Sequence, residues 1–168
     1  NLKEYIKPFL VKLDEHERPQ FYDGIGSGIA WRLKDKGLDE TIKAFEATVE
    51  KKDLPYLYRG WGSFFSLEIP EEFKEAEDVA SYIPQEYKMF FYQGLGLGVG
   101  FTGDIEEATG VLEKIDSRYR HFCYIGLGRK LGSAYKNDPR ALRGMLRNIN
   151  SRYHQYVLDG IAEGKGER

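Results

Sequence analysis

The sequence is poor in the residues that most often carry out chemistry. It has one cysteine and three histidines among 168 residues. A single cysteine excludes an internal disulfide and fits a reducing compartment, which favours the cytoplasm. The scattered His16, His121 and His154 form no metal-binding pattern, and no nucleophile elbow or Ser-His-Asp order is visible. We therefore expect no metal ion and no other cofactor, and the sequence favours a non-enzymatic role without excluding catalysis.

Long apolar runs and a strong net charge are also lacking. No run reaches the roughly 18 residues that a membrane-spanning helix needs, so we expect no membrane partner. No secretion signal is visible, although the chain opens at Asn1 rather than Met, which leaves secretion and a longer natural chain open. The net charge is −2, but residues 1–116 carry −9 and residues 117–168 carry +7. One end of the molecule is therefore expected to be acidic and the other basic.

What the chain has in abundance is glycine and aromatic residues, and these recur with a period. Four segments alternate glycine with other residues and a fifth is a degraded copy; their first glycines lie 32 to 36 residues apart, at Gly24, Gly60, Gly94, Gly126 and Gly160. Two residues before each first glycine stand Tyr22, Tyr58, Tyr92, Tyr124 and Leu158. A period in this range is typical of stacked supersecondary units.

Apolar spacing predicts that each glycine segment lies in a helix and that an amphipathic second helix follows it. The expected helices span about residues 2–13, 18–33, 39–51, 53–67, 71–83, 86–101, 105–115, 118–135, 141–149 and 152–163. Asp53 and Asp138 are expected N-caps, the second with Pro139 at the first helical position. Residues 164–168 are expected to form a frayed tail. The rival interpretation is a strand over residues 90–101, where apolar residues alternate with glycine, in a parallel sheet.

Helix-turn-helix units of about 34 residues with Gly and Tyr in the first helix resemble the tetratricopeptide-like class of α-solenoids. The resemblance covers nearly the whole chain but concerns the fold alone, because the small-residue and proline columns of a tetratricopeptide repeat do not line up. It implies an all-α, right-handed α-α superhelix of about five repeats, with residues 1–168 forming a single domain.

Glycine inside a helix costs about 1 kcal/mol relative to alanine, so its presence needs a reason. Gly24 and Gly28, like Gly94 and Gly98, are four residues apart and share one helix face. Such a face admits a neighbouring helix backbone or a flat ring. We expect the tyrosines of each repeat to pack over the glycine face of an adjacent one.

Two motifs invite a chemical interpretation that the pattern does not favour. The dinucleotide fingerprint G-x-G-x-x-G is not matched after Gly94, and after Gly126 its third glycine is replaced by Leu131. Cys123 as a nucleophile would need a base and a lowered pKa. It occupies a position held by apolar residues in the other segments, which indicates a small core residue.

The function that this sequence favours is a protein–protein interaction or scaffold module, because stacked repeats create an extended surface for a protein or peptide. One alternative is a small-ligand binder or enzyme with a cleft lined by the repeated tyrosines. Another is binding of an anion or nucleic acid by the basic C-terminal third. The oligomeric state stays open. The candidate binding surface consists of Arg59, Trp61, Arg118, Arg129, Arg140, Arg143 and Arg147.

Overall fold

A computed structural model describes residues 2–65, 67, 70–99 and 104–165, and this part of the chain is all-α. The rival strand over residues 90–101 is therefore wrong for residues 90–99, which lie in a helix as expected. The helices are α1 (Leu2–Leu10), α2 (Arg18–Leu33), α3 (Leu38–Thr48), α4 (Leu54–Ser63), α5 (Pro70–Tyr82), α6 (Gln85–Val99), α7 (Ile105–Leu112), α8 (Ser117–Ala134), α9 (Pro139–Leu146) and α10 (His154–Lys165), with short 3₁₀ turns at Lys34–Lys36, Lys51–Asp53 and Ser151–Tyr153. Within the described ranges, none of these helices has the length and apolar character to cross a membrane.

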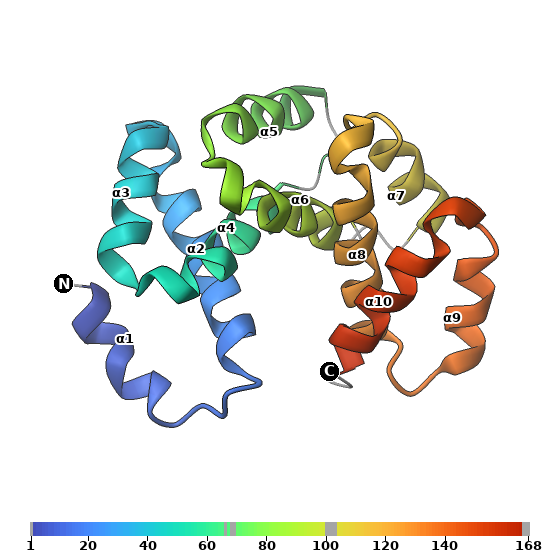
Figure 1. Ribbon diagram of the computed structural model, residues 1–168, viewed down its shortest axis with the longest axis horizontal. Coiled ribbons are helices and arrows are strands. Elements are labelled where there is room, and N and C mark those ends of the chain that lie inside the picture. The colour runs from blue at the N-terminus through green and yellow to red at the C-terminus, as the bar shows by residue number, and fades with distance from the viewer. Residues whose placement is uncertain (1, 66, 68–69, 100–103, 166–168) are drawn as a thin grey trace.

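The glycine-bearing helices α2, α4, α6, α8 and α10 pack one against the next, each chiefly on its two neighbours in this series. Figure 1 shows them as the inner part of an arch, with α3, α5, α7 and α9 on the outside and α1 beside α2. We call these five the glycine helices. The core lies between the two layers, because the apolar faces of the outer helices contribute buried residues such as Phe45, Val79 and Leu142.

Several helix ends follow the capping expected from the sequence. The Asp138 carboxylate accepts a hydrogen bond from the backbone N–H of Ala141 over 2.9 Å, and Pro139 is the first residue of α9, as predicted. Asp104 caps α7 in the same way.

Other ends differ from the expectation. Asp53 makes no side-chain cap: it is the last residue of the 3₁₀ turn Lys51–Asp53, which leads directly into α4, and its carboxylate lies near the Tyr22 hydroxyl. The expected tail starts too early, since α10 continues to Lys165. Residues 166–168 of that tail, and the expected break at Ile69 and helix end at 100–101, lie outside the described residues.

The first glycine of each later glycine helix lies directly against the backbone of the preceding one. A Cβ atom added at Gly60, Gly94, Gly126 or Gly160 would come within 1.8–2.0 Å of a carbonyl oxygen of that helix. The carbonyl always belongs to the residue just before the preceding helix's own first glycine. It comes in turn from Asp23, Arg59, Gln93 and Ile125.

The second glycine, two residues later, makes the matching contact with the following helix. A Cβ at Gly26, Gly62, Gly96 or Gly128 would lie 1.8–2.2 Å from a carbonyl oxygen of the next glycine helix. Residues two apart are about 200° apart around a helix, so G-x-G places bare backbone on opposite sides. This spacing explains why glycine alternates in a helix that has a close neighbour on each side.

The tyrosines do not cover the glycines, so that expectation is wrong. The three atoms nearest to a Cβ added at each covered glycine are all backbone atoms. The tyrosine two residues before the first glycine instead stacks on a tyrosine of the next unit, with nearly parallel rings. The ring centroids are 4.7 Å apart for Tyr58–Tyr87, 4.4 Å for Tyr92–Tyr119 and 4.0 Å for Tyr124–Tyr153.

Gly60 and Gly24 provide a matched test of the backbone contacts, since both are first glycines but only Gly60 is covered. Gly60→Ala places its methyl group into the Asp23 carbonyl, and we expect it to lower the free energy of unfolding by about 3 kcal/mol. Gly24→Ala meets nothing within 4 Å and should raise that free energy by about 1 kcal/mol through helix propensity. Urea denaturation measures both, and equal effects would contradict the contact.

The buried tyrosines predict a steep loss of stability at high pH. Burial raises the pKa of Tyr22 to about 12 and also raises the pKa values of Tyr58, Tyr92 and Tyr124 above the ordinary 10.0. Because the folded-state pKa values are raised, this stabilisation is present below pH 10 and is lost as the pH rises through the folded-state values. We expect the free energy of unfolding to fall above about pH 10.

The measurement is alkaline denaturation followed by circular dichroism and phenolate absorbance together. Tyr92→Phe should move the midpoint to higher pH, whereas Tyr82→Phe at an exposed position should not. Phenolate formation that is complete before any helix is lost would show that these rings are not buried.

Candidate functional site

A cavity of about 320 Å³ lies among the glycine helices and is the best candidate for a functional site. Its walls come from distant parts of the chain: the end of the α1–α2 loop and α2, then α6, α8 and α10. The lining residues are His16, Gln20, Asp23, Leu97, Arg129, Lys130, Ser133, Glu163, Gly164 and Lys165. We call it the inner cavity. In Figure 1, α2 and α10 lie on the two arms of the arch and α6 near its middle.

One side of the inner cavity rests on a buried ion pair between neighbouring glycine helices. The Arg59 guanidinium donates two hydrogen bonds to the Asp23 carboxylate, Nε to Oδ1 over 2.8 Å and Nη2 to Oδ2 over 2.9 Å. Asp23 is 8% exposed and Arg59 is 3% exposed. The guanidinium also lies over the Tyr56 ring, 5.1 Å from its centroid. A two-pronged bond of this kind fixes both side chains in orientation.

Arg129 of α8 lies across the cavity, with Glu163 of α10 beside it. Nη1 of Arg129 donates to Oε2 of Glu163 over 3.3 Å, a longer bond than those of Arg59. Burial, and secondarily the charge of Arg59, lowers the pKa of Arg129. Asp23 and Arg129 are close enough to affect each other's ionisation. Four charged side chains from α2, α4, α8 and α10 thus form one cluster.

The cluster pairs each carboxylate with a guanidinium, Asp23 with Arg59 and Glu163 with Arg129. Burial raises the pKa of Asp23, against the lowering effect of the Arg59 charge. In the part of the chain that the structure describes, no three His, Cys, Asp or Glu side chains come together to hold a metal ion. A partly buried guanidinium on a cavity wall is well suited to a carboxylate or phosphate group.

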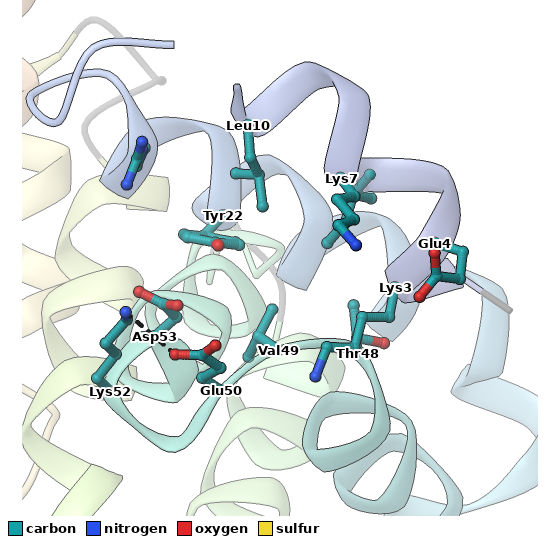
Figure 2. A pocket seen from close by; sticks show the side chains of 12 residues that line it. Lys3, Glu4, Lys7, Leu10, Tyr22, Thr48, Val49, Glu50, Lys52 and Asp53 are labelled. Atoms are coloured by element: carbon teal, nitrogen blue, oxygen red, sulfur yellow. Dashed lines mark ion pairs between the residues drawn. The ribbon is translucent and has the colours of Figure 1, made fainter. Parts of the chain in front are cut away.

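A second cavity, of about 360 Å³, lies between α1, α2 and the turn into α4 (Figure 2). Asp53 stands seven residues before a first glycine, where the later interfaces have Tyr87, Tyr119 and Tyr153. Its shorter side chain leaves room beside Tyr22. The rim mixes four basic and three acidic side chains, and Lys52 pairs with Glu50 over 3.0 Å. This mixture presents no single charge to a ligand.

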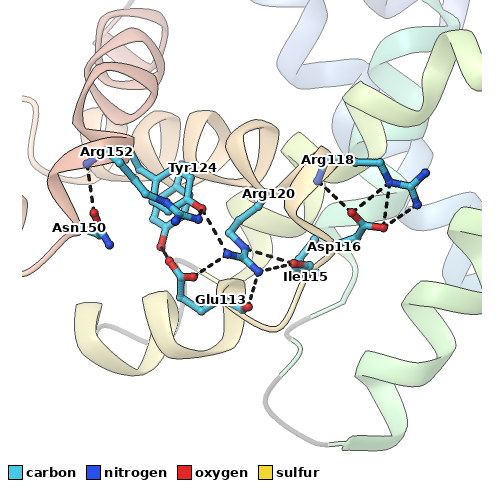
Figure 3. Close-up of polar contacts among 9 residues, drawn as sticks. Glu113, Ile115, Asp116, Arg118, Arg120, Tyr124, Asn150 and Arg152 are labelled. Atoms are coloured by element: carbon cyan, nitrogen blue, oxygen red, sulfur yellow. Dashed lines mark hydrogen bonds and ion pairs between the residues drawn. The ribbon is translucent and has the colours of Figure 1, made fainter.

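The basic C-terminal third is partly used to hold the fold together (Figure 3). Arg120 bonds to the Glu113 carboxylate over 2.7 Å and to the carbonyl oxygens of Glu113 and Ile115. Arg118 donates to Asp116, and these hydrogen bonds lower the pKa of Asp116 to about 2. Arg152 bonds to the Tyr153 hydroxyl. These arginines stabilise the turns before α8 and α10 by hydrogen bonds.

The predicted site residues fall into three groups. Arg129 lines the inner cavity, and Arg59 lies behind its wall, paired with the lining residue Asp23. Trp61 lies in the core, edge-on to Phe45 and Phe91, and is not a surface residue. The others are exposed and do not line the inner cavity: Arg118 is at the start of α8, and Arg140, Arg143 and Arg147 are on or just after α9.

The aromatic cleft expected by the alternative hypothesis does not form around the repeated residues. Tyr22, Tyr58, Tyr92 and Tyr124 are all at most 9% exposed. Cys123 is a fully buried core residue, as its position predicted, and burial raises the pKa of its thiol. Gly94, Gly96 and Gly98 lie inside α6 rather than at a strand-to-helix turn, which rules out the dinucleotide fingerprint there.

Asp23 and Glu163 were missed as site residues by sequence reasoning. A signal for Asp23 was present, because it stands one residue before a first glycine, as Arg59 does in the next segment. Opposite charges at one position of adjacent repeats indicate a pair across the interface. Comparison of the chain with known protein families, curated proteins and solved structures finds no match in any of the three.

Removing Arg59 tests whether the buried pair supports this site. Arg59→Met leaves the Asp23 charge buried without its partner, and we expect a loss of about 3–5 kcal/mol in the free energy of unfolding. The double variant Asp23→Leu/Arg59→Met removes both charges and should recover most of it. Urea denaturation makes the comparison, with Lys43→Met at the exposed pair with Glu40 as a control that should show no measurable loss. A loss in Arg59→Met no larger than in the control would refute the role.

Proposed function

We propose that this protein is a helical-repeat interaction module that binds an acidic segment of a partner protein in the inner cavity. The underlying architecture is a tetratricopeptide-like, right-handed superhelix of about five 34-residue units. The recurrence of the same two glycine contacts at four successive interfaces supports this architecture. A curved stack of this kind is suited to holding a peptide on its inner side.

The observation that carries the proposal is the position of Arg129. Its guanidinium has five N–H donors, and among the described residues it makes one hydrogen bond, the long one to Glu163. The cavity wall also carries Lys130 and Lys165, while the Asp23 carboxylate is matched by Arg59. Basic groups therefore outnumber acidic ones around the cavity. A carboxylate from an aspartate, a glutamate or a chain terminus has the complementary charge and shape.

The exposed arginines of α9 support a second candidate function. Arg140, Arg143 and Arg147 lie at helical spacings on an exposed surface, and no carboxylate bonds to them among the described contacts. Such a surface suits phosphate groups of a nucleic acid. These arginines lie on one exposed helix, whereas the inner cavity joins side chains from α2, α6, α8 and α10, so the inner cavity is the better-supported site.

The test compares labelled peptides of equal length that are rich in Asp and Glu, rich in Lys, or uncharged, by fluorescence anisotropy. We expect the acidic peptide alone to bind. Arg129→Gln should weaken that binding by about tenfold or more, because a charged hydrogen bond in a partly buried site is lost. Circular dichroism establishes that the variant is folded.

Arg143→Gln is the matched control, since it removes the same charge from an exposed position on α9. It should leave acidic-peptide binding unchanged. Equal weakening by Arg129→Gln and Arg143→Gln would mean general charge attraction and would contradict a site at the cavity. Tight binding of a single-stranded oligonucleotide that the triple variant Arg140→Gln/Arg143→Gln/Arg147→Gln abolishes would favour the α9 function instead.

A further inference from the structure

The series of glycine helices is open at one end. Gly24 and Gly28 of α2 are exposed, and a Cβ atom added to either would meet nothing within 4 Å. In α10, the equivalent Gly160 and Gly164 lie against backbone carbonyls of the preceding helix, from Ile125 and Arg129. In later units the corresponding glycine face is covered by the preceding helix. In α2 this face is present, but no helix of the described chain covers it.

Apolar side chains around this face are exposed where their counterparts are buried. Trp31, on the same side of α2 as Gly24 and Gly28, is 66% exposed. Phe9 of α1 lies 15 residues before a first glycine and is 47% exposed, whereas Phe45 and Val79 at the equivalent positions are 0% and 3% exposed. Val111 and Met145, the remaining equivalents, are partly buried against the core. The missing cover thus extends over α1 as well as α2, as a preceding helix of the series would.

At the opposite end of the series, the sequence of α10 does not allow a further helix to pack in the same way. The four helices that have a following neighbour, α2, α4, α6 and α8, all carry Tyr-x-Gly-x-Gly. In α10 the same positions hold Leu158, Gly160 and Ala162. At the second-glycine position of the other helices, a Cβ would lie within 2.2 Å of the next backbone. Ala162 therefore prevents another helix from approaching α10 in the same way.

We propose that the face formed by Gly24, Gly28 and the neighbouring Phe9 and Trp31 binds one α-helix of a partner polypeptide that carries Tyr-x-Gly-x-Gly. In α4, the carbonyl that meets the second glycine of α2, Gly26, belongs to Leu57, three residues before the first glycine. Phe21 holds the same position in α2. The partner helix therefore places its second glycine against the Phe21 carbonyl. Its tyrosine reaches Glu17, which lies seven residues before the first glycine, as Asp53 does beside Tyr22. The partner thus extends the series by one unit.

A second copy of this chain does not fit the requirement. Among its described helices, those with Tyr-x-Gly-x-Gly already have the second glycine covered by the next helix of the same chain. The exposed side of α10 carries Ala162, whose methyl group would strike the Phe21 carbonyl. The occupant therefore comes from outside these 168 residues.

The experiment supplies such a helix by joining a copy of residues 117–137 directly to Leu2. This join places the copied Gly126 34 residues before Gly24, the same spacing as between Gly126 and Gly160. The copied helix is held close to the face, so its docking does not depend on concentration. Thermal denaturation and limited proteolysis compare the extended protein with the 168-residue chain.

We expect the extended protein to melt at a higher temperature and its added helix to resist proteolysis. Gly24→Leu should abolish both gains, while in the 168-residue chain it should leave the melting temperature unchanged or higher, because the added side chain meets open space. Replacing the copied Gly128 by Leu in the extended protein should have the same effect as Gly24→Leu, and Gly110→Leu at another open glycine should have none.

Two outcomes would overturn the proposal. One is an extended protein whose stability and protease resistance do not depend on Gly24. The other is a dimer of the 168-residue chain, detected by light scattering, that Gly24→Leu dissociates, because the face would then be filled by a second copy. Neither outcome involves Arg129 or the inner cavity, so both leave the proposed peptide site to its own test.

Discussion

The contact of one helix backbone with the next, at glycine, is the constraint on which the rest of this structure depends. The first and second glycines make two such contacts at each of the four interfaces between α2, α4, α6, α8 and α10, and Gly132 and Gly164 add two more between α8 and α10. Each glycine weakens its own helix by about 1 kcal/mol, and the close packing of the helices offsets this cost. Since G-x-G exposes backbone on opposite sides, a helix can be flanked closely by two neighbours at once. The outer helices then cover the remaining apolar sides, and the stacked tyrosines fill the space between successive units.

The candidate site follows from that packing. When helices approach this closely and in a constant register, side chains at equivalent positions of adjacent helices come together. Asp23 and Arg59 hold the same position in α2 and α4, and they meet as a buried ion pair. Curvature of the stack then brings α8 and α10 towards α2, and Arg129 joins a cluster that no two consecutive helices could form. The charge distribution of the chain, acidic first and basic last, fits such a meeting of its two ends.

The sequence predicted the all-α class, ten helices close to their observed bounds, and the glycine helices as the centre of the fold. Those features depend on the spacing of apolar residues and glycines along the chain, which the sequence shows directly. The partners of the tyrosines and the position of Trp61 could not be predicted, because spacing defines a helix face without identifying its neighbour. Of the seven candidate surface residues, only Arg129 lines the inner cavity, because the curvature that brings α8 and α10 towards α2 is absent from any linear pattern. Asp53 was misjudged as a cap because the 3₁₀ turn Lys51–Asp53 leads directly into α4.

An interface made of main-chain atoms has a consequence for how such a molecule can vary in length. Side-chain interfaces must match knob to hole, so a unit fits only the neighbours with which it evolved. Here the closest contacts join glycine to peptide carbonyls, which every amino acid supplies, and the rings stacked beside them in the later units are all tyrosines. The unit that contains α6 could accordingly be followed by the one that contains α10 with no change to the residues between the glycines. Duplication or deletion of whole units would preserve the joint, and the number of units becomes a quantity that can change without redesign of the core.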